Sequence, residues 1–258
     1  MTTTTANINL YIFNEKRAVY GVGTYIRELT DLLSHNHVNI NICVVHLMSD
    51  KPQIQTEEVD DIKHLYFPAP VTEQQRIDHN KLDELYFRNV VYLLQLYIVE
   101  KKHLIFHLNY NQSGKLAEDL KKKFDCRIVS VVHGFIWCSI LSGNTTRFRK
   151  ILTSENNNHK GNGLKTTVFE WYCIECELFE IVDHIICLSE NTRLIMEDDY
   201  KINPNKINVI YNGLTDNNSI MNKQTLRQKY HVPDVPIFLF AGRLDDKKGL
   251  AQIGRAHV

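Results

Sequence analysis

The sequence has no surplus of charge of either sign, no long apolar run and no paired-cysteine pattern, and each absence excludes a class of protein. Its 258 residues include 30 basic and 30 acidic residues, so no overall field favours nucleic acid, and any anion must be bound locally. The six cysteines are scattered through apolar segments, which is typical of reduced core thiols and not of a small disulfide-stabilised domain.

Neither a targeting segment nor a membrane-spanning segment is expected. The N-terminal residues have neither a basic region nor a small-residue cleavage site after an apolar core, so we expect no signal peptide. The most apolar helical stretch, residues 90–99, is about half as long as a bilayer requires. We therefore expect a cytoplasmic protein, and peripheral contact with the inner face of the membrane stays open.

Short apolar strands alternate with amphipathic helices along the chain. Residues 8–13 form a near-continuous apolar run, as in a strand buried on both faces, and apolar residues at helical spacing follow from residue 23. This order predicts an α/β fold with a doubly wound parallel sheet. Later strands are expected at residues 39–47, 62–67, 104–108, 127–132, 184–188, 207–210 and 237–240, and later helices at 75–102, 115–123, 165–181, 190–200 and 223–230.

Polar residues 145–164 are expected to form a mobile surface loop. Arg147, Arg149 and Lys150 within it could meet an anionic acceptor, although a solvated basic face is the commoner explanation.

Histidine and asparagine side chains stand at the ends of two predicted strands. His107 and Asn109 end the strand at 104–108, and His133 with Gly134 follows the strand at 127–132. Ligands of open α/β sheets bind beyond the carboxyl ends of the strands, where a histidine can hydrogen-bond a hydroxyl or stabilise charge as a bond breaks. His133 is the preferred candidate, and a purely structural histidine is the alternative at both positions.

Gly21 and Gly23 precede the first helix, where backbone amides could approach a phosphate at the positive end of the helix. A dinucleotide-binding fingerprint would need a third glycine where Ile26 stands, and an acidic residue at the end of the second strand, where residues 46–49 offer none. Relief of a tight turn is the structural alternative for Gly21.

A cationic turn follows the last predicted strand, residues 237–240. The chain breaks at Gly242 and then carries Arg243 and Lys248. An arginine offers a planar fork and a lysine a mobile point charge, so the pair suits a diphosphate. A solvated turn with ordinary surface charge is the alternative.

The run Gly242-Arg243-Leu244 to Lys248-Gly249 resembles the start of the C-terminal domain of family 4 glycosyltransferases. These two-domain enzymes of the GT-B fold move a sugar from a nucleotide-sugar to an acceptor. The glycines at 21 and 23, the histidine at 133 and the run from 188 to 214 are similar to the N-terminal, Rossmann-like domain of the same family.

The resemblance implies roles for individual residues. Arg243 and Lys248 would bind the donor diphosphate, with Gly21 and Gly23 beside it, and His133 would lie at the catalytic centre. Further contacts to the acceptor or sugar are assigned to His107 and Asn109. The implied reaction is retaining, with no metal and no cofactor besides the nucleotide-sugar, and its expected setting is bacterial cell-envelope polysaccharide synthesis. The expected partners are this donor and a carbohydrate or lipid-linked acceptor, without nucleic acid.

The domain boundaries follow from the same resemblance. Residues 1–213 are expected to form the acceptor-side domain, and residues 214–252 the linker and the start of a donor-binding domain. That second stretch is too short for a doubly wound domain of roughly 100–150 residues. Because the donor-binding domain is incomplete, we expect the chain to turn over little by itself. Residues 253–258, IGRAHV, match what a common sequencing-adapter DNA encodes, so we expect them to be an artefact.

Two other functions stay open. A nucleotide-dependent oxidoreductase or epimerase could use the first glycines, and a noncatalytic domain could bind nucleotides or glycans.

Two further motifs are rejected. Cys173 and Cys176 lack the further ligands that zinc needs, and residues 161–166 depart from the spacing of a phosphate-binding P-loop.

Overall fold

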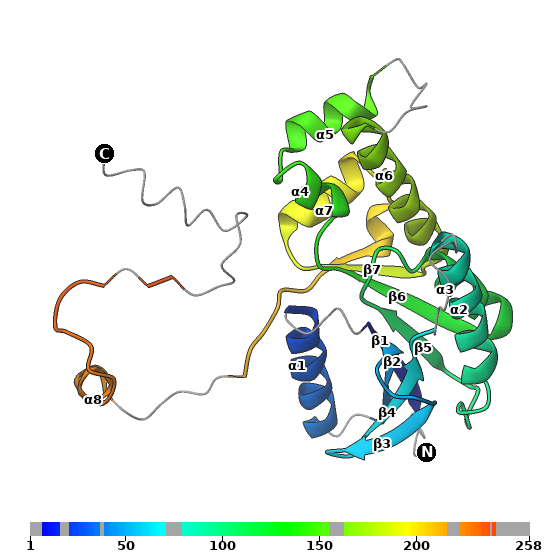
Figure 1. The fold of residues 1–258 in the computed structure, drawn as a ribbon, viewed down its shortest axis with the longest axis horizontal. Coiled ribbons are helices and arrows are strands. Elements are labelled where there is room, and N and C mark those ends of the chain that lie inside the picture. The colour runs from blue at the N-terminus through cyan, green and yellow to red at the C-terminus, as the bar shows by residue number, and fades with distance from the viewer. Residues whose placement is uncertain are drawn as a thin grey trace, which may run out of the picture. The chain divides into compact units, whose positions relative to one another are not determined.

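The computed structural model describes residues 7–15, 21–36, 39–70, 79–154, 163–215, 222–237 and 239–240. The chain divides into two compact units, residues 1–213 and 214–258. Within the described residues, the first unit contains an eight-stranded sheet of order β3-β4-β2-β1-β5-β6-β7-β8 (Figure 1). Its strands are β1 (Ile8–Glu15), β2 (Ile40–Ser49), β3 (Gln55–Val59), β4 (Ile62–Pro68), β5 (Leu104–Leu108), β6 (Cys126–Val132), β7 (His184–Cys187) and β8 (Ile207–Val209).

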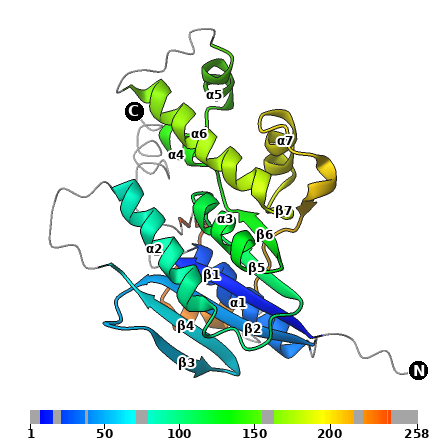
Figure 2. The ribbon, with the colours of Figure 1, turned by 90° about the vertical axis from the view of Figure 1, so that its right-hand side faces the viewer.

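All neighbouring strands are parallel except β3 and β4. Helix α1 lies on one side of the sheet, and α2 and α3 lie on the other (Figures 1 and 2). This arrangement confirms the predicted doubly wound α/β fold. The helices of the unit are α1 (Gly21–His35), α2 (His79–Leu94), α3 (Gly114–Lys123), α4 (Ile136–Ile140), α5 (Thr145–Leu152), α6 (Leu164–Ile181), α7 (Glu190–Asp198) and the short 3-10 helix η1 (Pro204–Lys206).

The central strand β1 is buried on both faces because its alternate side chains enter two different layers of the core. Leu10 and Ile12 pack with Ile26 of α1, whereas Tyr11 and Phe13 belong to the larger cluster on the other side. Each fully buried side chain of this size contributes roughly 1.5–3 kcal/mol, so the two layers fix β1 in register. The carboxyl end of this strand therefore has a firm position.

Strand β3 was not expected from the sequence. It is an antiparallel edge strand with exposed charges, Glu57 and Glu58, so it lacks the apolar run by which the buried strands were recognised. Asp60 and Asp61 join it to β4 with φ angles of 51° and 61°, which fits a two-residue hairpin turn that requires positive φ at both positions. The charged edge and this turn explain why the sheet is not wholly parallel.

Several helix boundaries differ from the prediction. Helix α2 ends at Leu94, not at residue 102, because the chain turns there through 3-10-type bonds from the N–H groups of Leu96 and Tyr97. Residues 145–152 form helix α5 where a loop was expected, since the side chain of Asn144 caps the N–H of Arg147. Helix α4 was not predicted, and α1 begins two residues earlier than expected.

The second unit contains helix α8 (Lys223–Lys229), whose N-cap is Asn222. Ile237, Leu239 and Phe240 are exposed by 49%, 86% and 38% and are not in a strand, contrary to prediction. No neighbouring strand pairs with them among the described residues, and an isolated strand has no ladder to stabilise it. Arg243, Lys248 and residues 253–258 lie outside the described residues.

All six cysteines are free thiols, which confirms the expectation of no disulfide framework. Among the described helices, none is long and apolar enough to span a membrane.

Candidate functional site

Three adjacent strands bring the predicted polar residues together. Strands β1, β5 and β6 are parallel neighbours, so their carboxyl ends meet at one edge of the sheet. At this edge Nε2 of His133 lies 3.0 Å from Oδ1 of Asn109, and Nδ2 of Asn109 lies 3.3 Å from Nδ1 of His107. His107, Asn109 and His133 therefore form one cluster.

Asn109 is the centre of this cluster. Its Nδ2 group also donates to the carbonyl oxygen of Phe13 at 3.0 Å, and the side chain is buried. A carbonyl oxygen only accepts, so this bond fixes which end of the amide faces Phe13. The second amide hydrogen then points to Nδ1 of His107, and the amide oxygen accepts from Nε2 of His133.

These bonds determine where the two imidazoles carry their protons. Burial lowers the pKa of His133 to about 4, and burial together with His133 lowers the pKa of His107 to about 4, so both rings are neutral at pH 7. His133 then has its hydrogen on Nε2 and a lone pair on Nδ1, for which the described residues provide no partner. His133 can accept a hydrogen bond or a proton at that atom.

Tyr25, on the second turn of α1, completes the cluster. Its hydroxyl oxygen lies 3.3 Å from Nε2 of His107, and its ring meets that of His133 edge-on, with centroids 4.9 Å apart. Since Nδ1 of His107 accepts from Asn109, Nε2 carries the hydrogen and donates to Tyr25. Burial raises the pKa of Tyr25 to about 12, so its hydroxyl keeps a proton that it can donate elsewhere.

The helical spacing in the sequence marks Tyr25 only as an apolar position of the helix, so its place in the cluster was not predicted. Its place directly after the glycine stretch, near the N-terminus of the helix, was the signal available.

Gly21 and Gly23 occupy the first turn of α1, not a loop. The first four N–H groups of an α-helix have no partner within the helix, so the predicted phosphate contact would be made by the helix terminus itself. Among the described residues, apart from its chain neighbours and the backbone of its own helix, none has an atom within 4 Å of a Cβ atom built at Gly21. The structure brings these glycines onto the helix that carries Tyr25, whereas Arg243 and Lys248 lie outside the described residues.

A row of polar rings extends from the cluster across the edge strands. Nδ2 of Asn14 lies 3.4 Å from Nδ1 of His46, whose Nε2 lies 2.9 Å from Nδ1 of His64. The ring of His46 also stacks on Tyr66, with centroids 4.4 Å apart. Burial, followed by the nearby His64, lowers the pKa of His46 to about 4.

This row bears on the dinucleotide-binding alternative. The dinucleotide-binding fingerprint has an acidic residue at the end of the second strand, where it binds a ribose. This chain has the neutral His46 near the end of β2 instead. Ile26, at the position of the third glycine, is buried and packs with Leu10 and Ile12 of β1, so a large side chain stands where the fingerprint requires a glycine.

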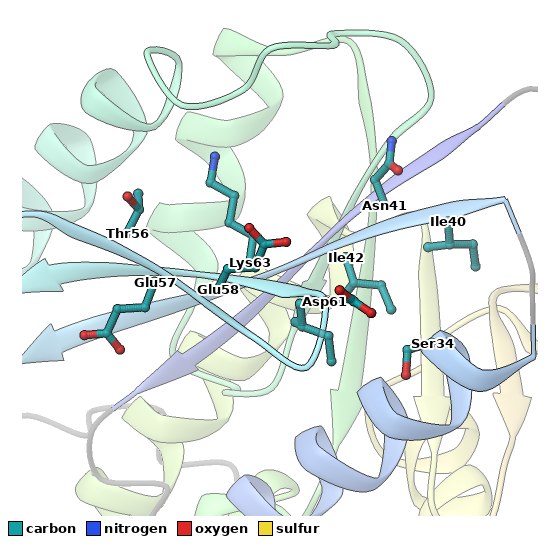
Figure 3. Close-up of a pocket in the computed structure, with 10 residues that line it drawn as sticks. Ser34, Ile40, Asn41, Ile42, Thr56, Glu57, Glu58, Asp61 and Lys63 are labelled. Atoms are coloured by element: carbon teal, nitrogen blue, oxygen red, sulfur yellow. The ribbon is translucent and has the colours of Figure 1, made fainter.

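Neither a metal-ligating group among the described residues nor the hollow lined by Ser34 and Lys63 coincides with this cluster. The described residues contain no group of three or more histidine, cysteine, aspartate or glutamate side chains that could hold a metal ion. A hollow of about 650 Å³ lies at the amino ends of β2 and β4, where Ser34, Asn41, Asp61 and Lys63 are among its lining residues (Figure 3). It is at the opposite edge of the sheet from His133 and includes none of the predicted site residues.

Arg149 is engaged in an ion pair. Its Nε and Nη2 atoms lie 2.8 Å and 3.0 Å from the two carboxylate oxygens of Asp199, whereas Arg147 and Lys150 are exposed. The paired geometry docks α5 against the end of α7.

The fold is similar to solved structures of GT-B glycosyltransferases. Sucrose-phosphate synthase from Thermosynechococcus elongatus matches with a TM-score of 0.65 and 17% identity, over 97% of this chain and 59% of that chain. TcCGT1 in complex with UDP matches with a TM-score of 0.50 and 12% identity, over 88% of this chain and 56% of that chain. The chain thus spans less than two thirds of the length of either protein. The fold defines a Rossmann-like domain of the GT-B class.

The sequence itself gives the family. The profile of Glycosyltransferase Family 4 matches residues 19–217, more than half of the chain, and the protein belongs to this family. A search of curated protein sequences finds no significant match.

Proposed function

We propose that the protein acts in a glycosyltransferase that moves a sugar from a nucleotide-sugar to a glycan, lipid or other acceptor with retention of configuration. The observation that carries the proposal is the cluster of His133, Asn109, His107 and Tyr25 at the carboxyl edge of a family 4 domain. Its polar groups are neutral and hydrogen-bonded, and they are held at the ends of β5 and β6 and on helix α1, as a site that orients a sugar requires.

His133 would touch the sugar at the reacting centre. Its Nε2–H group donates a hydrogen bond to Oδ1 of Asn109, and the lone pair on Nδ1 would accept a hydrogen bond from a sugar hydroxyl. Because His107 and Asn109 are buried, with exposed fractions of 5% and 3%, they would act through Tyr25 and His133 more than by direct contact with the sugar. The neutral rings add no charge of their own.

The departing diphosphate needs positive charge from elsewhere. As the bond between the anomeric carbon and the phosphate oxygen breaks, its electron pair leaves with the diphosphate. Arg243 and Lys248 would neutralise this charge, and the N–H groups near Gly21 and Gly23 would add the positive end of α1. The UDP held by TcCGT1, a protein of similar fold, supports a nucleotide diphosphate as the ligand.

Residues 1–213 would then be the acceptor-side domain, and residues 214–252 the linker and start of the donor-binding domain. No metal or cofactor is needed, because the cations supply the electrostatic stabilisation. A carbohydrate or lipid-linked acceptor would approach the polar row from His133 to Tyr66, and synthesis of a cell-envelope polysaccharide is the setting that we propose.

The test is a transfer assay on the protein expressed from its genomic locus, sequenced across the codons for residues 250–258, with a panel of nucleotide-sugars. We expect transfer or hydrolysis of one donor. His133→Ala should lower kcat by about a hundredfold or more, because a side chain positioned at the reaction centre typically contributes a factor of that size. Arg243→Ala should raise KM for the donor and lower kcat, because the diphosphate bears more charge in the transition state.

Lys150→Ala, which changes an exposed cation on α5, is the matched control for the charge substitution. Tight binding of a nicotinamide dinucleotide with no nucleotide-sugar turnover would contradict the proposal. Full transfer activity in His133→Ala would remove His133 from the reaction centre.

A further inference from the structure

Glu175 is a carboxylate on the buried face of helix α6. Its exposed fraction is 0%, and Val168, Leu178 and Phe179 are buried on the same helix. An acid at such a position is costly unless all its oxygens accept hydrogen bonds. The hydrogen-bond partners of Glu175 therefore indicate which segments the buried carboxylate holds in place.

Three neutral groups donate to Glu175. Oε1 accepts from Nδ2 of Asn111 at 2.8 Å and from the backbone N–H of Ile136 at 2.9 Å, and Oε2 accepts from the hydroxyl of Tyr200. Burial raises the pKa of Glu175, and these three bonds oppose the effect. Among the described residues no lysine or arginine forms an ion pair with it. The carboxylate thus serves hydrogen bonding, not charge pairing.

Glu175 holds the segment that follows His133 directly, through the N–H of Ile136, and indirectly, through Asn111. The second hydrogen of the Asn111 amide goes to the carbonyl oxygen of Gly134 at 2.9 Å, so Glu175 and Asn111 bind both sides of Phe135. Helix α4 starts at Ile136 with no side-chain cap from Phe135, and Glu175 takes the place of that cap. The chain is fixed at one and three residues beyond His133.

The same carboxylate also fixes the other half of the site. Asn111 lies two residues beyond Asn109, on the segment that follows β5. Glu175 therefore connects the two segments whose ends provide the His133–Asn109 hydrogen bond. A shift of either segment would separate Nε2 of His133 from Oδ1 of Asn109.

We propose that Glu175 is a positioning residue for the transfer reaction, which holds the segments after β5 and β6 so that Asn109 orients His133. The assignment rests on the proposed function for the role of His133 in transfer. Its structural part concerns this chain alone and can be measured without substrate.

The first experiment compares Glu175→Gln and Glu175→Met in the full chain, with the tautomer and titration of His133 followed by long-range ¹H–¹⁵N NMR. Glutamine keeps an oxygen that can accept from Asn111 and Ile136, whereas methionine has similar length and no such acceptor. We expect His133 in Glu175→Gln to stay as in the native protein, with its pKa about 4. In Glu175→Met it should titrate nearer to 6.5, with no single tautomer.

Tyr200→Phe is the matched control, because it removes a donor from the other carboxylate oxygen and leaves both bonds on Oε1. It should lower the melting temperature without changing the His133 signals. Unchanged His133 signals in a folded Glu175→Met protein would overturn the proposal. So would equal changes in Glu175→Met and Tyr200→Phe, or in Glu175→Met and Glu175→Gln, since these would indicate general loosening.

Should Glu175→Met fail to fold, Asn111→Ala decides the question. It removes the bonds to Glu175 and Gly134 and leaves the carboxylate with two donors. A shifted His133 titration supports positioning, and an unshifted one overturns it.

Kinetics then connect the position of His133 to the reaction. A small displacement of a reacting group can cost up to about a hundredfold in rate, so Asn111→Ala should lower kcat by roughly tenfold to a hundredfold and change KM by less than about threefold. Absence of transfer in the native protein would refute the proposed function and leave the NMR result on Glu175 standing. Normal kcat with a shifted His133 would refute the catalytic relevance of the positioning.

Discussion

His133 and Asn109 follow two different strands, β6 and β5, and a hydrogen bond of 3.0 Å joins Nε2 of the histidine to Oδ1 of the asparagine. Because Nδ2 of Asn109 donates to the carbonyl oxygen of Phe13, the amide oxygen has no alternative but to face His133. The backbone of β1 thus determines which nitrogen of His133 carries the proton. A neutral histidine with a defined tautomer is the central feature of the site.

Asn109→Asp should make His133 easier to protonate. The new carboxylate would stabilise the imidazolium, so the pKa of His133 should rise from about 4. An oxygen would also face the Phe13 carbonyl without a hydrogen between them, so the free energy of unfolding should fall by roughly 1–3 kcal/mol. NMR titration of His133 and urea unfolding measure both effects.

The control is Asn208→Asp, the same chemical change at an exposed position of β8. It should alter neither quantity. A His133 pKa that stays at about 4 in Asn109→Asp would show that the amide does not set the protonation of the ring.

Tyr25→Phe should destabilise the protein although the ring remains. It removes the oxygen that accepts from Nε2 of His107, and that buried N–H group would lose its partner. An unpaired buried donor costs about 1–3 kcal/mol, to be measured by urea unfolding. Tyr211→Phe, at a position exposed by 65%, should have no effect. Equal stability of Tyr25→Phe and the native protein would mean that His107 finds another acceptor.

Much of the fold could be predicted because its parallel strands are buried on both faces. A strand such as β1 must be apolar on both faces, and that pattern is visible in the sequence. Strand β3 is held by pairing with β4, and its side chains are exposed and charged, so no apolar pattern marks it. Helix α5 was missed because its polar residues resemble a loop, although Asn144 is a standard N-cap.

The grouping of the candidate site residues could be predicted in part for a similar reason. Position at a strand end indicated His107, Asn109 and His133, because parallel strands bring their carboxyl ends to one edge. Tyr25 and Glu175 act through contacts between segments far apart in the chain, and no local pattern gives such contacts. The one available signal for Glu175 was an acid on the apolar stripe of α6, at a position where burial demands partners.

The free energy of unfolding should fall as the pH is lowered from 6.5 to 4. His46, His107 and His133 have folded pKa values of about 4 and an ordinary value of 6.5, so the unfolded chain binds more protons in this window. Each histidine contributes up to about 1.4 kcal/mol per pH unit, and the full stability is present above pH 6.5. Glu175, whose pKa is raised by burial, acts in the opposite direction.

Urea unfolding at several pH values measures this slope, and His46→Gln should reduce it by about one histidine's share. His35→Gln is the control, because His35 is exposed on the last turn of α1. Equal slopes for His46→Gln and the native protein would show that His46 binds its proton as readily in the folded protein as in the unfolded chain.

Arg149→Ala should lower the melting temperature and leave acceptor kinetics unchanged. Arg149 forms two parallel bonds to Asp199, whose side chain is 7% exposed, so its removal leaves a nearly buried carboxylate without its cation. Arg149→Lys should not restore the stability, since a lysine cannot make the paired contact. Lys150→Ala, next to it in the chain and exposed, should melt like the native protein. A higher KM for an anionic acceptor in Arg149→Ala, with an unchanged melting temperature, would instead return Arg149 to the acceptor site that the sequence first indicated.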